Sequence, residues 1–169
     1  MRNPIDLGVG SHVPILAAAV ARTEGPVIEL GTGWWSTPLL HWMCQWKRAL
    51  VSYETDREWL EVMSQFKSEM HLMRHVTDWE EAEFYGNYGV AFIDCSMDAS
   101  QRPHHRPRLA KRLKGRAHFI VCHDTEADIR PAAGDYGWAE LDGLFKYQST
   151  FTGIRPWTTV YSDVEEFTL

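Results

Sequence analysis

The sequence predicts an α/β fold built on a mostly parallel sheet. Helical patterns with a period near 3.6 residues alternate along the chain with short runs of β-branched and aromatic residues, as expected when helices connect parallel strands. The chain has 169 residues, which suits one domain over residues 1–169 and leaves no room for a second of similar size. No repeat or low-complexity linker interrupts the pattern.

The first half of the chain contains two predicted strands. A helix is predicted over 12–22, then a strand over 26–30, a helix over 37–47 and a strand over 49–54. Pro38 suits the first turn of its helix, where a missing N–H group costs nothing.

A third helix is predicted just after the second strand. Thr55 and Glu58 have the spacing of a capping box, in which each side chain satisfies a backbone N–H group of the first turn. Apolar side chains then recur at helical spacing and predict a buried stripe, which consists of Trp59, Met63, Phe66 and Met70.

The second half continues the alternation and ends in a β-rich segment. The remaining predicted strands are 72–77, 89–94 and 118–123, and the remaining predicted helices are 105–114 and 136–146. Residues 147–162 are interrupted by Gly153 and Pro156, which predicts two antiparallel strands that close one edge of the sheet.

The most informative segment is the loop that follows the first strand. Gly31 and Gly33 stand in a Gly-x-Gly pattern directly after a short apolar run, and Ser36 and Thr37 can cap the next helix. Glycine lets a backbone adopt conformations that are closed to other residues and lets a ligand approach closely. The segment therefore predicts a ligand-binding loop between strand and helix.

Acidic residues stand at or just past the ends of all five predicted parallel strands. In an open parallel sheet, ligands bind outside the carboxyl ends of the strands. Clustered carboxylates are costly without a cationic or hydroxyl-rich partner, so this edge predicts such a ligand. The acidic residues are Glu29, Glu54, Asp78, Asp94 and Asp124, the last preceded by His123.

The spacing of Glu54 favours a ligand that contains ribose. Glu54 lies 54 − 31 = 23 residues after Gly31, where a carboxylate can bind the two ribose hydroxyls. A nicotinamide dinucleotide would place a pyrophosphate over the loop, near Glu29, and normally needs a third glycine where Ser36 stands. A ligand with an ammonium and a sulfonium group avoids that repulsion. An NAD-dependent oxidoreductase is therefore the second choice.

With these residues in place, the chain resembles the class I S-adenosylmethionine-dependent methyltransferases over nearly its whole length. The resemblance implies a Rossmann-like, doubly wound sheet of about seven strands with a C-terminal antiparallel hairpin. It also implies that Glu29 and the Gly31–Gly33 loop hold the methionine part, Glu54 the ribose, and Asp78 with Trp79 the adenine. The full set of implied cofactor contacts is Glu29, Gly31, Thr32, Gly33, Ser36, Glu54, Thr55, Asp78, Trp79 and Asp94.

Within that family, the ends of strands four and five resemble small-molecule O-methyltransferases of the macrolide-sugar type. Some of these use a divalent metal, and the resemblance implies Asp94 and Asp124 as its ligands. The predicted catalytic residues are Asp94, His123 and Asp124, with His123 as the first candidate for a general base and His12 as the second. The expected partner is a small-molecule acceptor.

The charge distribution leaves one further alternative open. The net charge is −6, yet seven Lys and Arg residues fall between Arg102 and Arg116 without any acid. Such a run can attract nucleic acid, so a non-catalytic module that binds cofactor or nucleic acid is an alternative. A solvated helix face explains the run more simply, and we expect no nucleic-acid partner.

Cysteine usage and hydropathy predict a cytoplasmic protein. Cys44, Cys95 and Cys122 form no CxxC pair and are odd in number, which favours reduced thiols. The longest apolar run is far below the roughly 18 residues typical of a membrane span, and we expect no membrane partner.

Overall fold

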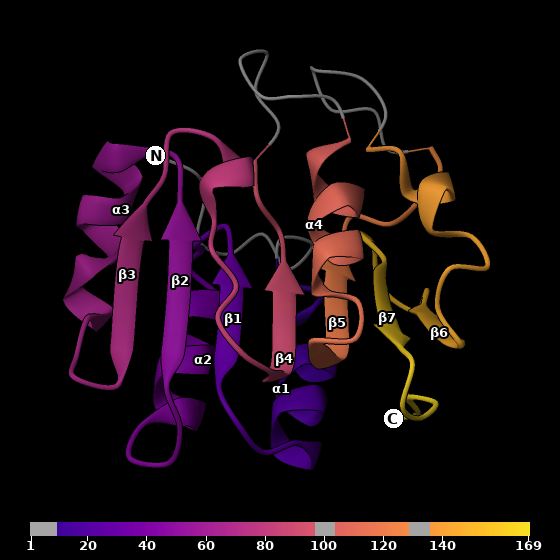
Figure 1. Cartoon of the computed structure of the whole chain (residues 1–169), viewed down its shortest axis with the longest axis horizontal. Coiled ribbons are helices and arrows are strands. Elements are labelled where there is room, and N and C mark those ends of the chain that lie inside the picture. Colours follow the sequence, from indigo (N-terminus) through magenta and orange to yellow (C-terminus); the bar gives the residue numbers. More distant parts are fainter. Residues whose placement is uncertain (1–9, 97–103, 129–135) are drawn as a thin grey trace.

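The computed structural model describes residues 10–96, 104–128 and 136–169. Its centre is a seven-stranded sheet with the strand order β3-β2-β1-β4-β5-β7-β6 (Figure 1). The first five strands are parallel, whereas β7 is antiparallel to both β5 and β6. Their bounds are β1 Val27–Leu30, β2 Leu50–Glu54, β3 His71–His75, β4 Tyr88–Ile93, β5 Ala117–His123, β6 Tyr147–Phe151 and β7 Thr158–Ser162.

Helices cover both faces of this sheet. The helices α1 (Val13–Arg22) and α2 (Ser36–Cys44) pack on one face, and α4 (His105–Leu113) packs on the other (Figure 1). Every side chain of β1 and β4 is buried, as is typical of central parallel strands covered on both sides. The predicted mixed sheet with its antiparallel C-terminal pair is therefore confirmed.

The third helix is shorter than predicted and has a different cap. Helix α3 spans Arg57–Met63 and continues as a 3₁₀ turn, η1, over Ser64–Phe66. The Asp56 carboxylate accepts a hydrogen bond from the backbone N–H of Trp59, so Asp56 is the cap and the predicted Thr55 capping box is wrong. The tighter 3₁₀ turn rotates later residues out of register. The helical spacing therefore ends with this turn: Met63 in α3 is fully buried, whereas Met70, beyond η1, is exposed.

The helix predicted over 136–146 is also wrong. The described part of that segment holds only a 3₁₀ turn, η3, over Trp138–Leu141. Gly137 and Gly143 flank it with φ of +79° and +68°, and left-handed residues of this kind end a helix. The apolar spacing in the sequence reflects burial of Trp138 and Leu141 against the sheet.

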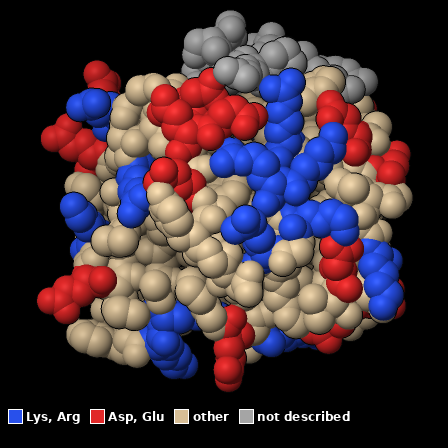
Figure 2. Space-filling model, in the orientation of Figure 1, with Lys and Arg blue, Asp and Glu red and all other residues tan. Residues whose placement is uncertain are grey.

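From His104 onward the basic run folds into α4 and the residues that follow it, whereas Arg102 lies outside the described residues. Figure 2 shows the resulting cluster of Lys and Arg side chains with acidic groups close beside it. Arg108 and Arg112 lie 4.0 and 3.5 Å from the Glu80 carboxylate, and the Lys111 ammonium lies 2.6 Å from Glu140. This partial neutralisation is typical of an ion-paired helix surface and lessens its attraction for phosphate.

No helix within the described residues has the length and apolar character needed to cross a lipid bilayer. All three cysteines are buried and unpaired.

Candidate cofactor and catalytic site

The loop after β1 can be built only with glycine at its first position. Gly31 has a φ of +96°, and a Cβ added there would lie 2.5 Å from the Cα of Cys95. No side chain fits so close to the backbone that follows β4. Farther along the loop, the backbone N–H of Gly33 donates to the Thr37 hydroxyl at 2.9 Å, which ties the loop to the first turn of α2.

Glu54 joins this loop to the end of β2. One carboxylate oxygen accepts from the backbone N–H and the hydroxyl of Thr32, at 2.9 and 3.0 Å. The other accepts from the backbone N–H groups of Thr55 and Asp56, at 2.7 and 3.1 Å. The Trp59 indole closes the arrangement by donating to the Thr32 carbonyl oxygen at 2.8 Å. The glycine loop and Glu54, far apart in sequence, therefore form one surface.

Glu29 lies beneath the loop rather than on its surface. Its side chain is fully buried, and its carboxylate accepts from the Thr37 hydroxyl at 3.0 Å and from the Ser52 hydroxyl at 2.5 Å. Burial raises the pKa of Glu29 to about 7, although these hydroxyls, together with that of the buried Ser36, work in the opposite direction. In this conformation Glu29 supports the loop from below.

The structure separates the two residues expected at the adenine. Asp78 follows β3, is partly exposed, and accepts from the backbone N–H of Glu80 at 2.9 Å to cap the 3₁₀ turn η2 (Trp79–Glu81). The Trp79 side chain has no accessible surface and packs near His105, with ring centroids 6.1 Å apart. The short turn directs the Trp79 ring into the core, so its indole is not on the surface that Asp78 faces, and the expected adenine contact stays a prediction.

A buried arginine links the acids that follow β4 and β5. The Arg106 guanidinium lies 3.1 Å from a carboxylate oxygen of Asp94 and 3.1 Å from one of Asp124. It also donates to the carbonyl oxygens of Cys95 and His123 and covers the ring of Tyr136. The expected metal site between Asp94 and Asp124 is therefore not supported, because a cationic side chain occupies the space between them.

Arg106 was missed as a site residue because it belongs to the basic run. Only 3% of its surface is exposed. The signal was present in the sequence, since Arg106 stands three, four and seven positions before Leu109, Ala110 and Leu113, which form the buried face of α4. A charged residue in register with an apolar stripe indicates a buried ion pair.

Three further side chains gather on the other side of Asp94. Its second carboxylate oxygen lies 3.2 Å from Nδ1 of His123, whose Nε2 lies 2.9 Å from the Ser11 hydroxyl. His12 precedes α1, and its ring centroid lies 4.6 Å from that of His123. Both nitrogens of the His12 ring are buried and have no hydrogen-bond partner among the described residues.

Mutual electrostatics set the charges in this group. Burial disfavours charge on His123, but the Asp94 and Asp124 carboxylates outweigh it and raise its pKa. Although burial alone would raise the pKa of Asp94, His123 and Arg106 hold it well below its ordinary value. Burial, aided by His123, lowers the pKa of His12 to about 3. The group thus combines an ionised Asp94 with one charge-prone and one neutral imidazole.

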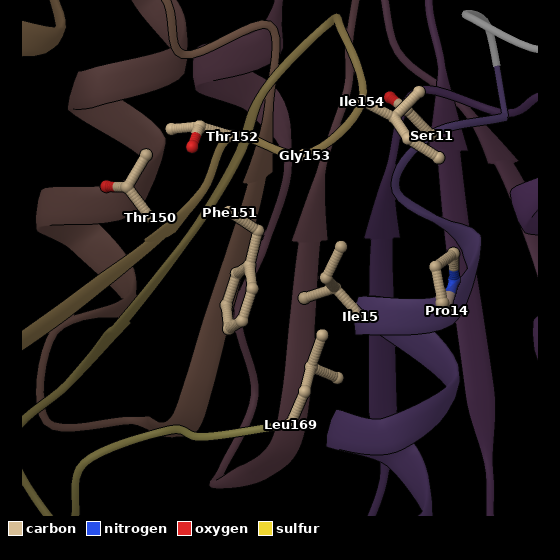
Figure 3. A pocket seen from close by; sticks show the side chains of 9 residues that line it. All are labelled: Ser11, Pro14, Ile15, Thr150, Phe151, Thr152, Gly153, Ile154 and Leu169. Atoms are coloured by element: carbon tan, nitrogen blue, oxygen red, sulfur yellow. The ribbon is translucent and has the colours of Figure 1, made fainter.

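An apolar hollow of about 340 Å³ adjoins this group (Figure 3). It lies between the start of α1 and the end of β6, and Ser11, which contacts His123, forms part of its wall. The other walls are mostly apolar and include Pro14, Ile15, Phe151, Ile154 and Leu169. A small molecule with an apolar part fits such a surface.

Comparison with solved structures places this arrangement in a known fold. An O-methyltransferase from Klebsiella pneumoniae, described as putative, superposes with a TM-score of 0.67 at 14% identity, over 97% of this chain and 84% of that one. The O-methyltransferase TomG from Streptomyces achromogenes, solved with S-adenosylmethionine, superposes with a TM-score of 0.63 at 15% identity, over 90% of this chain and 79% of that one. Human methyltransferase-like protein 13, solved with S-adenosylhomocysteine, superposes with a TM-score of 0.64 at 15% identity, over 92% of this chain and 82% of that one.

The chain has the class I methyltransferase fold. No family model and no curated protein matches the sequence. In this methyltransferase fold, the Gly31 loop, Asp78, Asp94 and Asp124 follow the carboxyl ends of parallel strands and Glu54 ends one, as the sequence predicted.

Proposed function

We propose that this protein transfers the methyl group of S-adenosylmethionine to a small acceptor molecule, with oxygen as the expected acceptor atom. The observation that carries the proposal is the contact between Glu54 and Thr32, which joins the end of β2 to the glycine loop on one surface. The structural neighbours include methyltransferases solved with this cofactor or its product.

The cofactor contacts assigned in this proposal follow the loop and its neighbours. Gly31, Thr32 and Gly33 provide backbone for the methionine part, and Ser36 and Glu29 support that backbone from below. Glu54 and Thr55 face the ribose, Asp78 the adenine amine, and Asp94 the reacting end. Glu54 has to release part of its present hydrogen bonding to accept from the ribose hydroxyls.

Bound S-adenosylmethionine supplies an electrophilic methyl carbon. When an acceptor oxygen bonds to that carbon, the carbon–sulfur bond breaks, its electron pair stays on sulfur, and the acceptor proton has to leave. In the metal-free protein we assign His123 as the base for this proton, because Asp94 and Asp124 stabilise the imidazolium that forms. Ser11 and Arg106 hold these groups in position.

The hollow beside Ser11 supports a small acceptor with an apolar part. Positioning donor and acceptor in line supplies most of the rate enhancement that such a reaction needs. A cytoplasmic location stays a prediction.

The test is calorimetric titration of the full chain with S-adenosylmethionine, S-adenosylhomocysteine and NAD in parallel. We expect binding of the first two at micromolar concentration and weaker or no binding of NAD. Tighter binding of NAD, or no binding of either sulfur compound by folded protein, would refute the proposal. With binding established, transfer of a labelled methyl group to pooled hydroxylated small molecules tests the reaction.

A further inference from the structure

We propose that His12, Asp94 and His123 form a binding site for a divalent transition-metal ion such as Zn²⁺ or Co²⁺. The inference concerns metal binding itself and does not require the proposed methyl transfer. Each of the three residues offers one ligand atom, and these atoms all lie within 4.8 Å of one another. Two imidazoles and a carboxylate are a donor set that suits zinc and its neighbours in the transition series.

Ser11 fixes which nitrogen of His123 faces the site. The Ser11 hydroxyl donates its only proton to the Pro156 carbonyl oxygen at 2.6 Å, so it can only accept from Nε2 of His123. Nδ1 therefore points at Asp94, at 3.2 Å. Metal-binding histidines typically donate their second ring N–H to a fixed partner in this manner, which orients the ring and its lone pair.

Asp94, like His123, is oriented by a neighbouring side chain. One of its oxygens is bound by Arg106, and the other faces His123. Because Asp94 and Asp124 bring two negative charges against one on Arg106, this region has a net excess of negative charge before His123 is considered. A metal ion can take the place of a proton between Asp94 and His123.

The environment of His12 favours a metal ion over a simple ion pair. Its side chain is 2% exposed, and within the part of the chain that the structure describes neither ring nitrogen has a hydrogen-bond partner. A buried imidazole without partners is costly, and a metal ion would satisfy it. Ligand atoms on one tetrahedral zinc ion lie about 3.3 Å apart, so the 4.8 Å span has to shrink by about 1.5 Å. No hydrogen bond from residues 10–96, 104–128 or 136–169 restrains the His12 ring against that movement.

Three protein ligands leave a fourth position for water or for an acceptor oxygen. The Asp94 side chain is 23% exposed, so the site is open to solvent. With the ion bound, His123 would serve as a ligand rather than as a base. Coordination of an acceptor hydroxyl would then lower its pKa so that its proton passes to solvent water, and this consequence alone rests on the proposed function.

The test uses the full chain without an affinity tag, stripped with a chelator and titrated with Co²⁺ in the absence of S-adenosylmethionine. We expect one equivalent to bind, visible by its ligand-field absorption and displaced by Zn²⁺. His12→Phe should weaken binding at least about tenfold. His118→Phe is the matched control, since His118 pairs with one carboxylate, Glu165, outside the cluster, and it should bind like the wild type.

Wild-type protein that binds no stoichiometric Co²⁺, or a folded His12→Phe variant that binds it equally well, would overturn the inference. X-ray absorption on the wild-type Co²⁺ complex gives a second measurement that needs no variant. Two imidazole ligands are expected, and fewer than two would also overturn it. Titration with S-adenosylmethionine is separate, so failure of metal binding and failure of the proposed function remain distinguishable.

Discussion

The Thr37 hydroxyl lies 3.0 and 3.1 Å from the two carboxylate oxygens of Glu29 in the interior of the protein. Thr37 also accepts from the backbone N–H of Gly33, so the protonation state of Glu29 is linked to the glycine loop. A buried acid with a pKa near 7 has consequences for stability that can be measured.

The first prediction concerns Glu29 and pH. Its pKa rises from 4.5 in the unfolded chain to about 7 in the folded protein, so the folded state keeps a proton that the unfolded state loses. The free energy of unfolding should therefore fall as pH rises from 4.5 to 7, by about 3 kcal/mol from this group. Glu29→Gln should remove that loss.

Urea unfolding of the wild type and Glu29→Gln at pH 5 and pH 8 measures the effect. The stability of the variant relative to the wild type should be higher at pH 8 than at pH 5. An equal difference at both pH values would show that Glu29 does not hold a proton in the folded state.

The second prediction concerns Gly31→Ala. A methyl group at position 31 meets the backbone at Cys95 and also has to adopt a φ of +96°. We expect a loss of about 3 kcal/mol or more in the free energy of unfolding, together with loss of cofactor binding. Gly86→Ala is the matched control, because Gly86 has a φ of +86° and nothing within 4 Å of the added Cβ.

The control should lose only about 1–2 kcal/mol, which is the cost of a left-handed conformation. Chemical denaturation and cofactor titration on both variants give the comparison. Similar losses in the two variants would mean that the contact with Cys95 is unimportant.

The parts of the fold that the sequence predicted best are those where a single physical cause dominates. Strands β1 and β4 are buried on both sides, so their sequences are mostly apolar, with Glu29 as the one charged exception, and this composition indicates a central position in the sheet. The Gly31 loop was predictable because the close approach of Cys95 to the loop backbone leaves room only for glycine at position 31. In these places local sequence and tertiary packing require the same residues.

The errors come from places where tertiary contacts override a local pattern. The helical spacing around Trp138 and Leu141 serves packing against the sheet, while Gly137 and Gly143 prevent a longer helix. Arg106 was hidden among exposed cations, and Ser11 carries no motif. The role of Ser11 depends on Pro156, 145 residues away, and no local pattern encodes such a distance.

The third prediction concerns Arg106→Gln. Removing this guanidinium leaves Asp94 and Asp124 facing each other in a mostly buried site without a cation between them. We expect a loss of about 3–5 kcal/mol in the free energy of unfolding, because an uncompensated buried charge is costly. Arg108→Gln is the control in the same helix, since Arg108 is largely exposed and lies 4.0 Å from Glu80.

The control should change stability by less than about 1 kcal/mol. Equilibrium denaturation at neutral pH compares the two variants. If Arg106→Gln proves as mild as Arg108→Gln, the ion pairs of Arg106 do not stabilise the fold.

The last prediction tests whether Glu54 binds the ribose or only holds the loop. Glu54→Gln replaces one accepting oxygen with an NH₂ group, which cannot accept from Thr32 or from a ribose hydroxyl. We expect affinity for S-adenosylhomocysteine to fall about 10- to 100-fold. Glu58→Gln, an exposed position on α3, should bind normally.

A 2′-deoxyribose analogue of S-adenosylhomocysteine separates the two roles. If Glu54 accepts from the ribose, the analogue should bind more weakly than the parent compound in the wild type but about equally in Glu54→Gln, because the same interaction is removed twice. If Glu54 only holds Thr32, the two losses should add. Calorimetry on the four combinations decides between a direct contact and support of the loop, and additive losses would remove Glu54 from the ribose site.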